Sequence, residues 1–103
     1  MAAIIKIGDF DDFPLGEGRI VQVGRFTLAV FRAGDNVYAI DNTCPHEDRS
    51  LGEGMFENGK VTCPGHGWQF DVATGERILM PQIKVQTYRT IVNETKEVFV
   101  ELP

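Results

Sequence analysis

Cys44-Pro45-His46 and Cys63-Pro64-Gly65-His66 are the two segments of this 103-residue chain that point to its fold, and they contain all of its cysteines and histidines. Each segment pairs one thiol with one imidazole, and sixteen residues separate His46 from Cys63. Thiolates and imidazoles are the ligands of zinc and of iron-sulfur clusters. Because the chain uses these residue types nowhere else, we expect the two segments to hold a metal centre together.

The composition predicts one globular domain, residues 1-103, with no membrane and no nucleic-acid partner. Apolar residues make up 43% of the chain and charged residues 24%, which is ordinary for a globular protein. No apolar run approaches the roughly 20 residues that span a bilayer, and the N-terminal sequence lacks the features of an export signal. A net charge of -5 disfavours binding to phosphates. We therefore expect a cytoplasmic protein.

Acidic residues are concentrated around the first Cys/His segment. Between Asp41 and Glu57 there are five acids and a single base, Arg49. One interpretation is a solvated loop that its charges keep soluble. The other is a negative rim that steers a basic partner toward the metal centre.

The hydrophobic pattern predicts an all-β protein built from short strands. Runs rich in β-branched and aromatic residues alternate with segments that contain Gly, Asn and Asp, as strands alternate with tight turns. No window of 11 or more residues has a helical pattern, although Phe10 to Leu15 could form one short turn. The predicted strands are Ala3 to Ile7, Arg19 to Val23, Phe26 to Phe31, Val37 to Asp41, Lys60 to Cys63, Trp68 to Val72, Val85 to Val92 and Glu97 to Leu102.

Both Cys/His segments fall in Pro- and Gly-containing loops that predicted strands flank. Two hairpin-like loops would have to meet at their tips to bring four ligands together. This arrangement predicts a loop-rich cluster-binding subdomain at about 42-81, inserted into an antiparallel β scaffold that 1-41 and 82-103 form.

Three kinds of covalent or metal chemistry compete for these residues. A disulfide would leave two histidines unexplained and suits an oxidising compartment. Zinc accepts two cysteines and two histidines, but its ligand pairs usually contain one residue type at wider spacing. A [2Fe-2S] cluster with two cysteines on one iron and two histidines on the other matches the mixed pairs. Its neutral imidazoles leave the oxidised site uncharged and raise its potential above that of an all-cysteine site.

The two segments, with the extension Gly67-Trp68-Gln69-Phe70-Asp71 and Thr74-Gly75, resemble the Rieske [2Fe-2S] domain. The likeness covers the whole chain and is greatest to the Rieske-type ferredoxins of bacterial aromatic-ring-hydroxylating dioxygenase systems. It implies a Rieske fold with one [2Fe-2S] cluster at one tip. It also implies a proline-bearing loop over the cluster, which Met80-Pro81-Gln82 would supply.

The resemblance further implies how each ligand is used. Cys44 and Cys63 would bind the buried iron, and His46 and His66 would bind the outer iron at the surface. These four residues are the predicted cofactor-binding and metal ligands, and no catalytic residue is expected.

The chain departs from respiratory and photosynthetic Rieske proteins at three positions. Gly65 stands where those proteins have an additional, disulfide-forming cysteine, and Trp68 and Phe70 stand where they have a serine and a tyrosine that donate hydrogen bonds to the cluster sulfurs. Fewer such donors stabilise the reduced cluster less, so we expect a potential at the low end of the Rieske range, near roughly -150 mV. Phe70 is also expected to be an ordinary core residue.

The expected function is electron transfer and not catalysis. An oxygenase would need a mononuclear iron site of two histidines and a carboxylate, and both histidines are already assigned. Gly16-Glu17-Gly18 is too short to be a nucleotide-binding fingerprint. The resemblance therefore implies a one-electron carrier from an NAD(P)H-dependent flavoprotein reductase to a terminal Rieske non-haem iron oxygenase of aromatic compound degradation. A small Rieske-like subunit of an assimilatory nitrite reductase is the alternative.

A carrier must dissociate from each partner, which suits a small interface with an apolar centre and a charged rim. Apolar residues in or near the predicted ligand loops could form that centre, or could simply pack over the cluster. They are Pro45, Leu51, Pro64, Met80 and Pro81.

Overall fold

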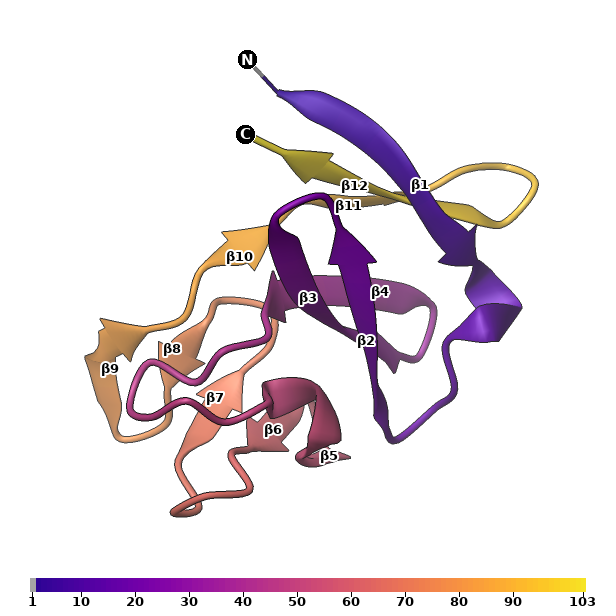
Figure 1. Ribbon diagram of the computed structural model, residues 1–103. Coiled ribbons are helices and arrows are strands. Elements are labelled where there is room, and N and C mark those ends of the chain that lie inside the picture. The colour runs from indigo at the N-terminus through magenta and orange to yellow at the C-terminus, as the bar shows by residue number, and fades with distance from the viewer. Residues whose placement is uncertain (1) are drawn as a thin grey trace.

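Three antiparallel β-sheets make up the protein in this computed structural model, which describes residues 2–103 (Figure 1). Among these residues the only helical segments are two 3-10 turns, η1 (Phe10–Asp12) and η2 (Leu51–Glu53), and neither is long enough to cross a membrane. The first sheet contains, in spatial order, β1 (Ala3–Asp9), β12 (Glu97–Leu102) and β11 (Thr90–Val92). The second contains β10 (Thr87–Tyr88), β4 (Asn36–Asp41), β3 (Phe26–Ala33) and β2 (Gly18–Val23). The third contains β5 (Met55–Glu57), β6 (Lys60–Thr62), β7 (Gln69–Asp71), β8 (Glu76–Arg77) and β9 (Met80–Lys84).

The central strand β3 connects the two halves of the hydrophobic core. Successive side chains of a strand point to opposite faces, so alternate residues of β3 enter different clusters. Leu28 and Val30 pack with β12, whereas Ala29 and Phe31 pack with the third sheet. The second of these clusters contains both cysteines, so the two predicted thiolate ligands share a core cluster with residues of β3.

Most of the predicted strands are confirmed, as are the all-β class and the short turn after Asp9. The prediction of one strand from Val85 to Val92 is wrong. The Val85 amide donates to the Gly75 carbonyl near the third sheet, Thr87–Tyr88 pairs with β4, and Thr90–Val92 pairs with β12. One apolar run thus contacts three sheets in turn. Its residue pattern does not indicate where the chain passes from one sheet to the next.

The prediction of a loop at Met80-Pro81-Gln82 is also wrong, because these residues form the start of β9. This strand is the last of its sheet, where proline is tolerated because no neighbour needs its missing amide. Of the two roles considered for Leu51, the structure supports packing. This residue lies in η2 with no exposed surface and is a core residue, so it cannot form part of a docking face.

Candidate metal centre

The first ligand loop connects β4 to η2 and is closed by backbone hydrogen bonds. The Cys44 amide donates to the Arg49 carbonyl at 3.0 Å, and the Leu51 amide donates to the Asn42 carbonyl at 2.7 Å. The buried Asn42 side chain adds a reciprocal pair of hydrogen bonds with the Ser50 hydroxyl, at 2.8 and 3.1 Å. These contacts fix both ends of the loop, so His46 projects from a closed turn.

The second ligand loop connects β6 to β7 and closes in the same way. The Cys63 amide donates to the Trp68 carbonyl at 2.7 Å, five residues along the chain, as the Cys44 amide does in the first loop. Inside the loop the Gly67 amide donates to the Cys63 carbonyl at 3.1 Å, and Gly67 has a φ of 77°, a conformation that favours glycine. Both predicted ligand pairs therefore lie in turns with a common closing bond.

The two thiols lie together at the bottom of the loops. Cys44 is 2% exposed and Cys63 is 1% exposed, and both are free thiols. Burial raises the pKa of the Cys44 thiol, and the neighbouring Cys63 raises it further, while the amides of His46 and Glu47 oppose the shift by donating to its sulfur. The same amides would stabilise a metal-bound thiolate.

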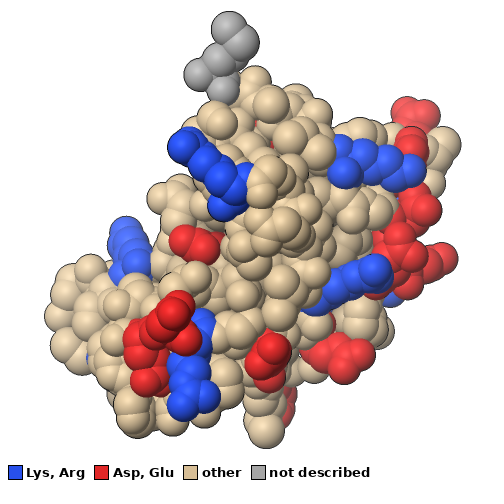
Figure 2. Space-filling view, viewed as in Figure 1, with Lys and Arg blue, Asp and Glu red and all other residues tan. Residues whose placement is uncertain are grey.

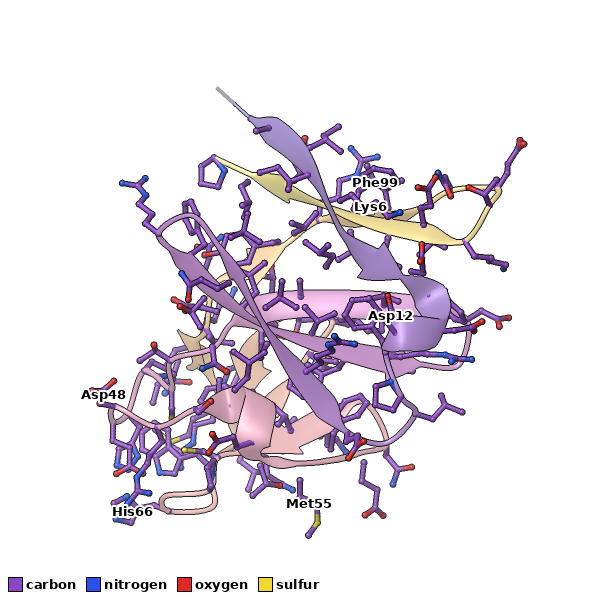
Figure 3. The ribbon with its side chains drawn as sticks, turned by 45° about the vertical axis from the view of Figure 1, so that its right-hand side comes forward. Lys6, Asp12, Asp48, Met55, His66 and Phe99 are labelled. Atoms are coloured by element: carbon purple, nitrogen blue, oxygen red, sulfur yellow. The ribbon has the colours of Figure 1, made fainter. Side chains whose placement is uncertain are left out.

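The two imidazoles lie nearer to the surface than the thiols. Their ring centroids are 4.8 Å apart, and their side chains are 26% exposed for His46 and 64% for His66. Figure 3 shows His66 at the end of the molecule opposite Lys6 and Phe99. The structure thus brings all four predicted ligands to one end of the molecule, with the two thiols buried and the two imidazoles nearer to the surface.

The Glu47 carboxylate lies among these ligands and was not predicted. One oxygen is 3.2 Å from His66 Nδ1, and the other is 4.0 Å from His46 Nδ1 and 3.9 Å from Cys63 Sγ. A Cβ built at Gly65 would overlap the end of the Glu47 side chain, so the carboxylate lies directly against the second ligand loop. The sequence signals for Glu47 were its position directly after His46 and its membership of the acidic cluster between Asp41 and Glu57.

The donor set distinguishes between two kinds of iron centre. The ligand atoms of His46, Glu47 and His66 lie within 4.8 Å of one another, a combination that suits mononuclear iron. Two buried thiols directly beside them suit a binuclear cluster with one sulfur-ligated and one nitrogen-ligated iron. The residues present therefore fit a [2Fe-2S] cluster, since a mononuclear site would leave both thiols without a role.

An aromatic and cationic stack covers one of the imidazoles. The His46 ring lies nearly parallel to the Trp68 ring, with centroids 4.0 Å apart and planes at 16°. The Arg77 guanidinium carbon lies 3.4 Å from the Trp68 ring centroid. Phe70 is fully buried, as predicted, whereas Trp68 is only partly buried and contacts a ligand.

A comparison with known proteins agrees with the geometry. The family model described as the Rieske [2Fe-2S] domain matches residues 3–89. Ferredoxin CarAc of Metapseudomonas resinovorans is 46% identical over 57 residues, which cover 55% of this chain and only about half (53%) of that protein. The ferredoxin component of the naphthalene 1,2-dioxygenase/salicylate 5-hydroxylase systems of a Ralstonia species is 34% identical over 79 residues, 76% of each chain.

Solved structures show the same relationship. A chain in the complex of reduced oxygenase and oxidized ferredoxin in carbazole 1,9a-dioxygenase is 36% identical, with a TM-score of 0.84 over 94% of this chain and 91% of that one. A structure described as an NADH-dependent nitrite reductase small subunit from Mycobacterium tuberculosis has a TM-score of 0.89 over 100% of this chain and 97% of that one, but at 21% identity it shows the fold alone. The chain therefore belongs to the Rieske [2Fe-2S] family, among the ferredoxins of aromatic-ring dioxygenase systems, and its cofactor is one Rieske-type [2Fe-2S] cluster.

Proposed function

We propose that Cys44 and Cys63 hold the inner iron of the cluster, that His46 and His66 hold the outer iron, and that the protein passes single electrons to a terminal oxygenase. The observation that carries this proposal is the layering of the four side chains, with buried thiols below partly exposed imidazoles. The bound cluster supplies reversible one-electron chemistry. The chain supplies the ligands and a surface at which the imidazoles can approach another protein.

The electron acceptor in this proposal is a ring-hydroxylating oxygenase. A relative 36% identical to this chain occurs in a solved structure of a complex between oxygenase and ferredoxin, which supports a direct contact of this kind. The donor would be an NAD(P)H-dependent flavoprotein reductase. This half of the proposal rests on the chemistry of the chain, which has no nucleotide-binding fingerprint of its own and so needs a separate protein to oxidise the nicotinamide.

The docking face of this carrier would surround the two ligand loops. Pro45, Pro64, Met80 and Pro81 are exposed there, and Leu79, at the turn between β8 and β9, is 94% exposed. Figure 2 shows acidic and basic side chains next to one another over this end of the molecule. Arg77, joined to the first loop by the stack on His46, adds a positive charge to the acidic rim expected from sequence. An apolar centre with a mixed rim suits brief contacts.

Reconstitution tests the carrier role. The reductase and oxygenase of a carbazole dioxygenase system would be mixed with carbazole and NADH, with the purified protein added or omitted, and hydroxylated product measured. We expect turnover to depend on the protein and to rise with its concentration. The Cys63→Ser variant, which lacks one inner-iron ligand, is the matched control and should not restore turnover. Equal turnover without the protein would contradict the proposal.

The ligand assignment has its own test. His66→Cys replaces a neutral outer ligand with an anionic one, so an assembled cluster should have a lower reduction potential than the parent protein. Spectroelectrochemistry measures the potential, and the low-average-g EPR signal after dithionite reports whether a Rieske cluster is present. A higher potential, or a Rieske signal that the substitution does not change, would exclude His66 as a ligand.

A further inference from the structure

We propose that Trp68 and Arg77 position the outer-iron ligand His46 and raise the reduction potential of the cluster through the three-layer stack they form with its ring. This inference rests on the ligand assignment proposed above. It gives a role to the tryptophan that follows the second ligand loop and to an arginine that the sequence motif does not include.

The position of the stack follows from the backbone. Trp68 ends the second ligand loop, where its carbonyl accepts the closing hydrogen bond from the Cys63 amide at 2.7 Å, so its backbone is held in register with a predicted ligand. Its ring reaches across to the first loop and lies 4.0 Å from the His46 ring at 16°. Trp68 therefore connects the two ligand loops, because its backbone closes the second loop and its side chain contacts His46 of the first.

Arg77 completes the stack from β8. Its guanidinium carbon is 3.4 Å from the Trp68 ring centroid, and its Nη1 lies 3.1 Å from Met80 Sδ across the turn between β8 and β9. A guanidinium is planar and pairs well with the face of tryptophan, the strongest cation–π partner among the side chains. Because Arg77 covers the outer face of Trp68, the ring is fixed from both sides and the plane of the His46 ring is fixed with it.

The charge of Arg77 gives the stack an electrostatic effect. Arg remains protonated in proteins, and the proposed cluster becomes more negative by one unit when it accepts an electron. A positive charge one aromatic ring away from His46 favours the reduced state and so raises the potential.

The first experiment measures the potential of Arg77 variants by redox titration against mediators. We expect Arg77→Gln to weaken the cluster's equilibrium constant for accepting an electron about three- to tenfold, a fall of roughly 30–60 mV at 59 mV per tenfold. Arg77→Lys keeps the charge and should retain most of the parent potential. Arg32→Gln is the matched control, because Arg32 covers Phe10 at 4.0 Å in the other core cluster and its loss changes net charge equally.

The outcomes separate the stack from the rest of the proposal. If Arg77→Gln and Arg32→Gln have the same potential as the parent protein, Arg77 does not tune the cluster. If the parent protein itself lacks the Rieske EPR signal, the ligand assignment is wrong, and the proposed role of the stack, which depends on that assignment, is wrong with it.

The second experiment tests positioning by EPR of the reduced protein. Trp68→Leu removes the ring that His46 lies against, so the g-values should shift and the lines broaden as the imidazole samples more orientations. Trp68→Phe restores an aromatic face and should return the spectrum toward that of the parent. Identical spectra for all three proteins would overturn the positioning role. Should Trp68→Leu assemble no cluster, Trp68→Met replaces it as the variant without an aromatic ring, with a shifted spectrum supporting the role and a spectrum identical to that of the parent excluding it.

Discussion

Glu47 shows how a single side chain can modify the cluster without being one of the predicted ligands. Its carboxylate is 3.2 Å from His66 Nδ1, 4.0 Å from His46 Nδ1 and 3.9 Å from Cys63 Sγ, so it occupies the space between three predicted ligands and has to leave that space when the cluster binds. Because Glu47 directly follows His46, its charge stays near the cluster, and reduction adds another negative charge there. The chain therefore sets Glu47 against Arg77, one side chain that disfavours the reduced state and one that favours it.

The substitution Glu47→Gln should raise the reduction potential. Removing one charge from a partly exposed site changes the free energy of reduction by about 1 kcal/mol, which is roughly 40 mV for one electron. Redox titration measures the shift, and Asp48→Asn is the control because it removes the same charge from the adjacent, exposed residue. A fall in potential, or equal shifts in both variants, would be incompatible with a local effect of Glu47.

The sequence was informative for residues that act within one loop and silent for those that act between loops. Spacing and residue type predicted the cluster, which the comparison confirms, and named Cys44, His46, Cys63 and His66, whose individual roles stay a prediction. Trp68 was recognised only as a departure from other Rieske proteins. Its stack with Arg77 depends on the register of β7 and β8, where Phe70 pairs with Arg77, and no local pattern encodes that pairing.

At the scale of elements, the turn between β8 and β9 holds an apolar side chain in an unfavourable backbone conformation. Arg77 pairs with Met80, so Ile78 and Leu79 form a two-residue turn in which Leu79 has a φ of 73° and is 94% exposed. The left-handed region costs a residue such as leucine about 1 kcal/mol, whereas asparagine tolerates it better.

We expect Leu79→Asn to stabilise the protein while weakening its coupling to the oxygenase. Relief of backbone strain should raise the melting temperature by about 2–5 °C. Loss of the apolar contact should raise several-fold the ferredoxin concentration that gives half-maximal oxygenase turnover. Ile4→Asn is the control for coupling, since Ile4 is 60% exposed on β1 of the first sheet and should leave coupling unchanged. A less stable Leu79→Asn variant with normal coupling would refute this interpretation of the turn.

The first ligand loop depends on one buried amide. Asn42 Oδ1 accepts from the Gly52 amide at 2.8 Å, and its side chain exchanges hydrogen bonds with the Ser50 hydroxyl. Asn42→Leu would leave a buried donor unpaired and should reduce the free energy of unfolding by about 2–3 kcal/mol. Urea unfolding measures this loss, and absorbance in the visible range follows release of the cluster. Asn42→Asp keeps the acceptor for Gly52 and should lose less stability, so equal losses would argue against this hydrogen bond.

At the scale of the whole molecule, an ion pair joins two strands of the first sheet near the turn between β11 and β12. Lys6 on β1 donates to Glu97 on β12, with 2.8 Å between Nζ and Oε2. This hydrogen bond, with others from Asn93 and Thr95, lowers the pKa of Glu97 to about 2. The same contact raises the pKa of Lys6 above its ordinary value.

The pH dependence of stability follows from these two directions. A carboxylate with a lowered pKa stabilises the fold above its unfolded-state pKa of 4.5, and the contribution disappears as the pH falls toward about 2. We therefore expect Glu97→Gln to be less stable than the parent at pH 6 and equally stable near pH 2. Urea unfolding over this range is the measurement. The contribution of Lys6 should be complete below pH 10.5 and lost as the pH rises through its raised pKa. A difference that persists unchanged at pH 2 would show that Glu97 acts by packing.

The overall class was predictable because turn residues divide the chain into short strands, but the assignment of strands to sheets was not. Val85 to Val92 reads as one strand in sequence, since apolar residues look alike whichever sheet receives them. The proposed division into a cluster-binding unit at about 42-81 and a scaffold stays a prediction. The third sheet extends to Lys84, and its core cluster includes Ala29 and Phe31 of the scaffold.

The position of β9 at the edge of the third sheet has a consequence for self-association. An unpaired edge strand can recruit the same strand of another molecule and begin aggregation. Pro81 removes one amide from that edge and Lys84 places a charge on it, two devices that block such pairing. This protected edge therefore disfavours strand-to-strand association of the third sheets of two copies of the protein.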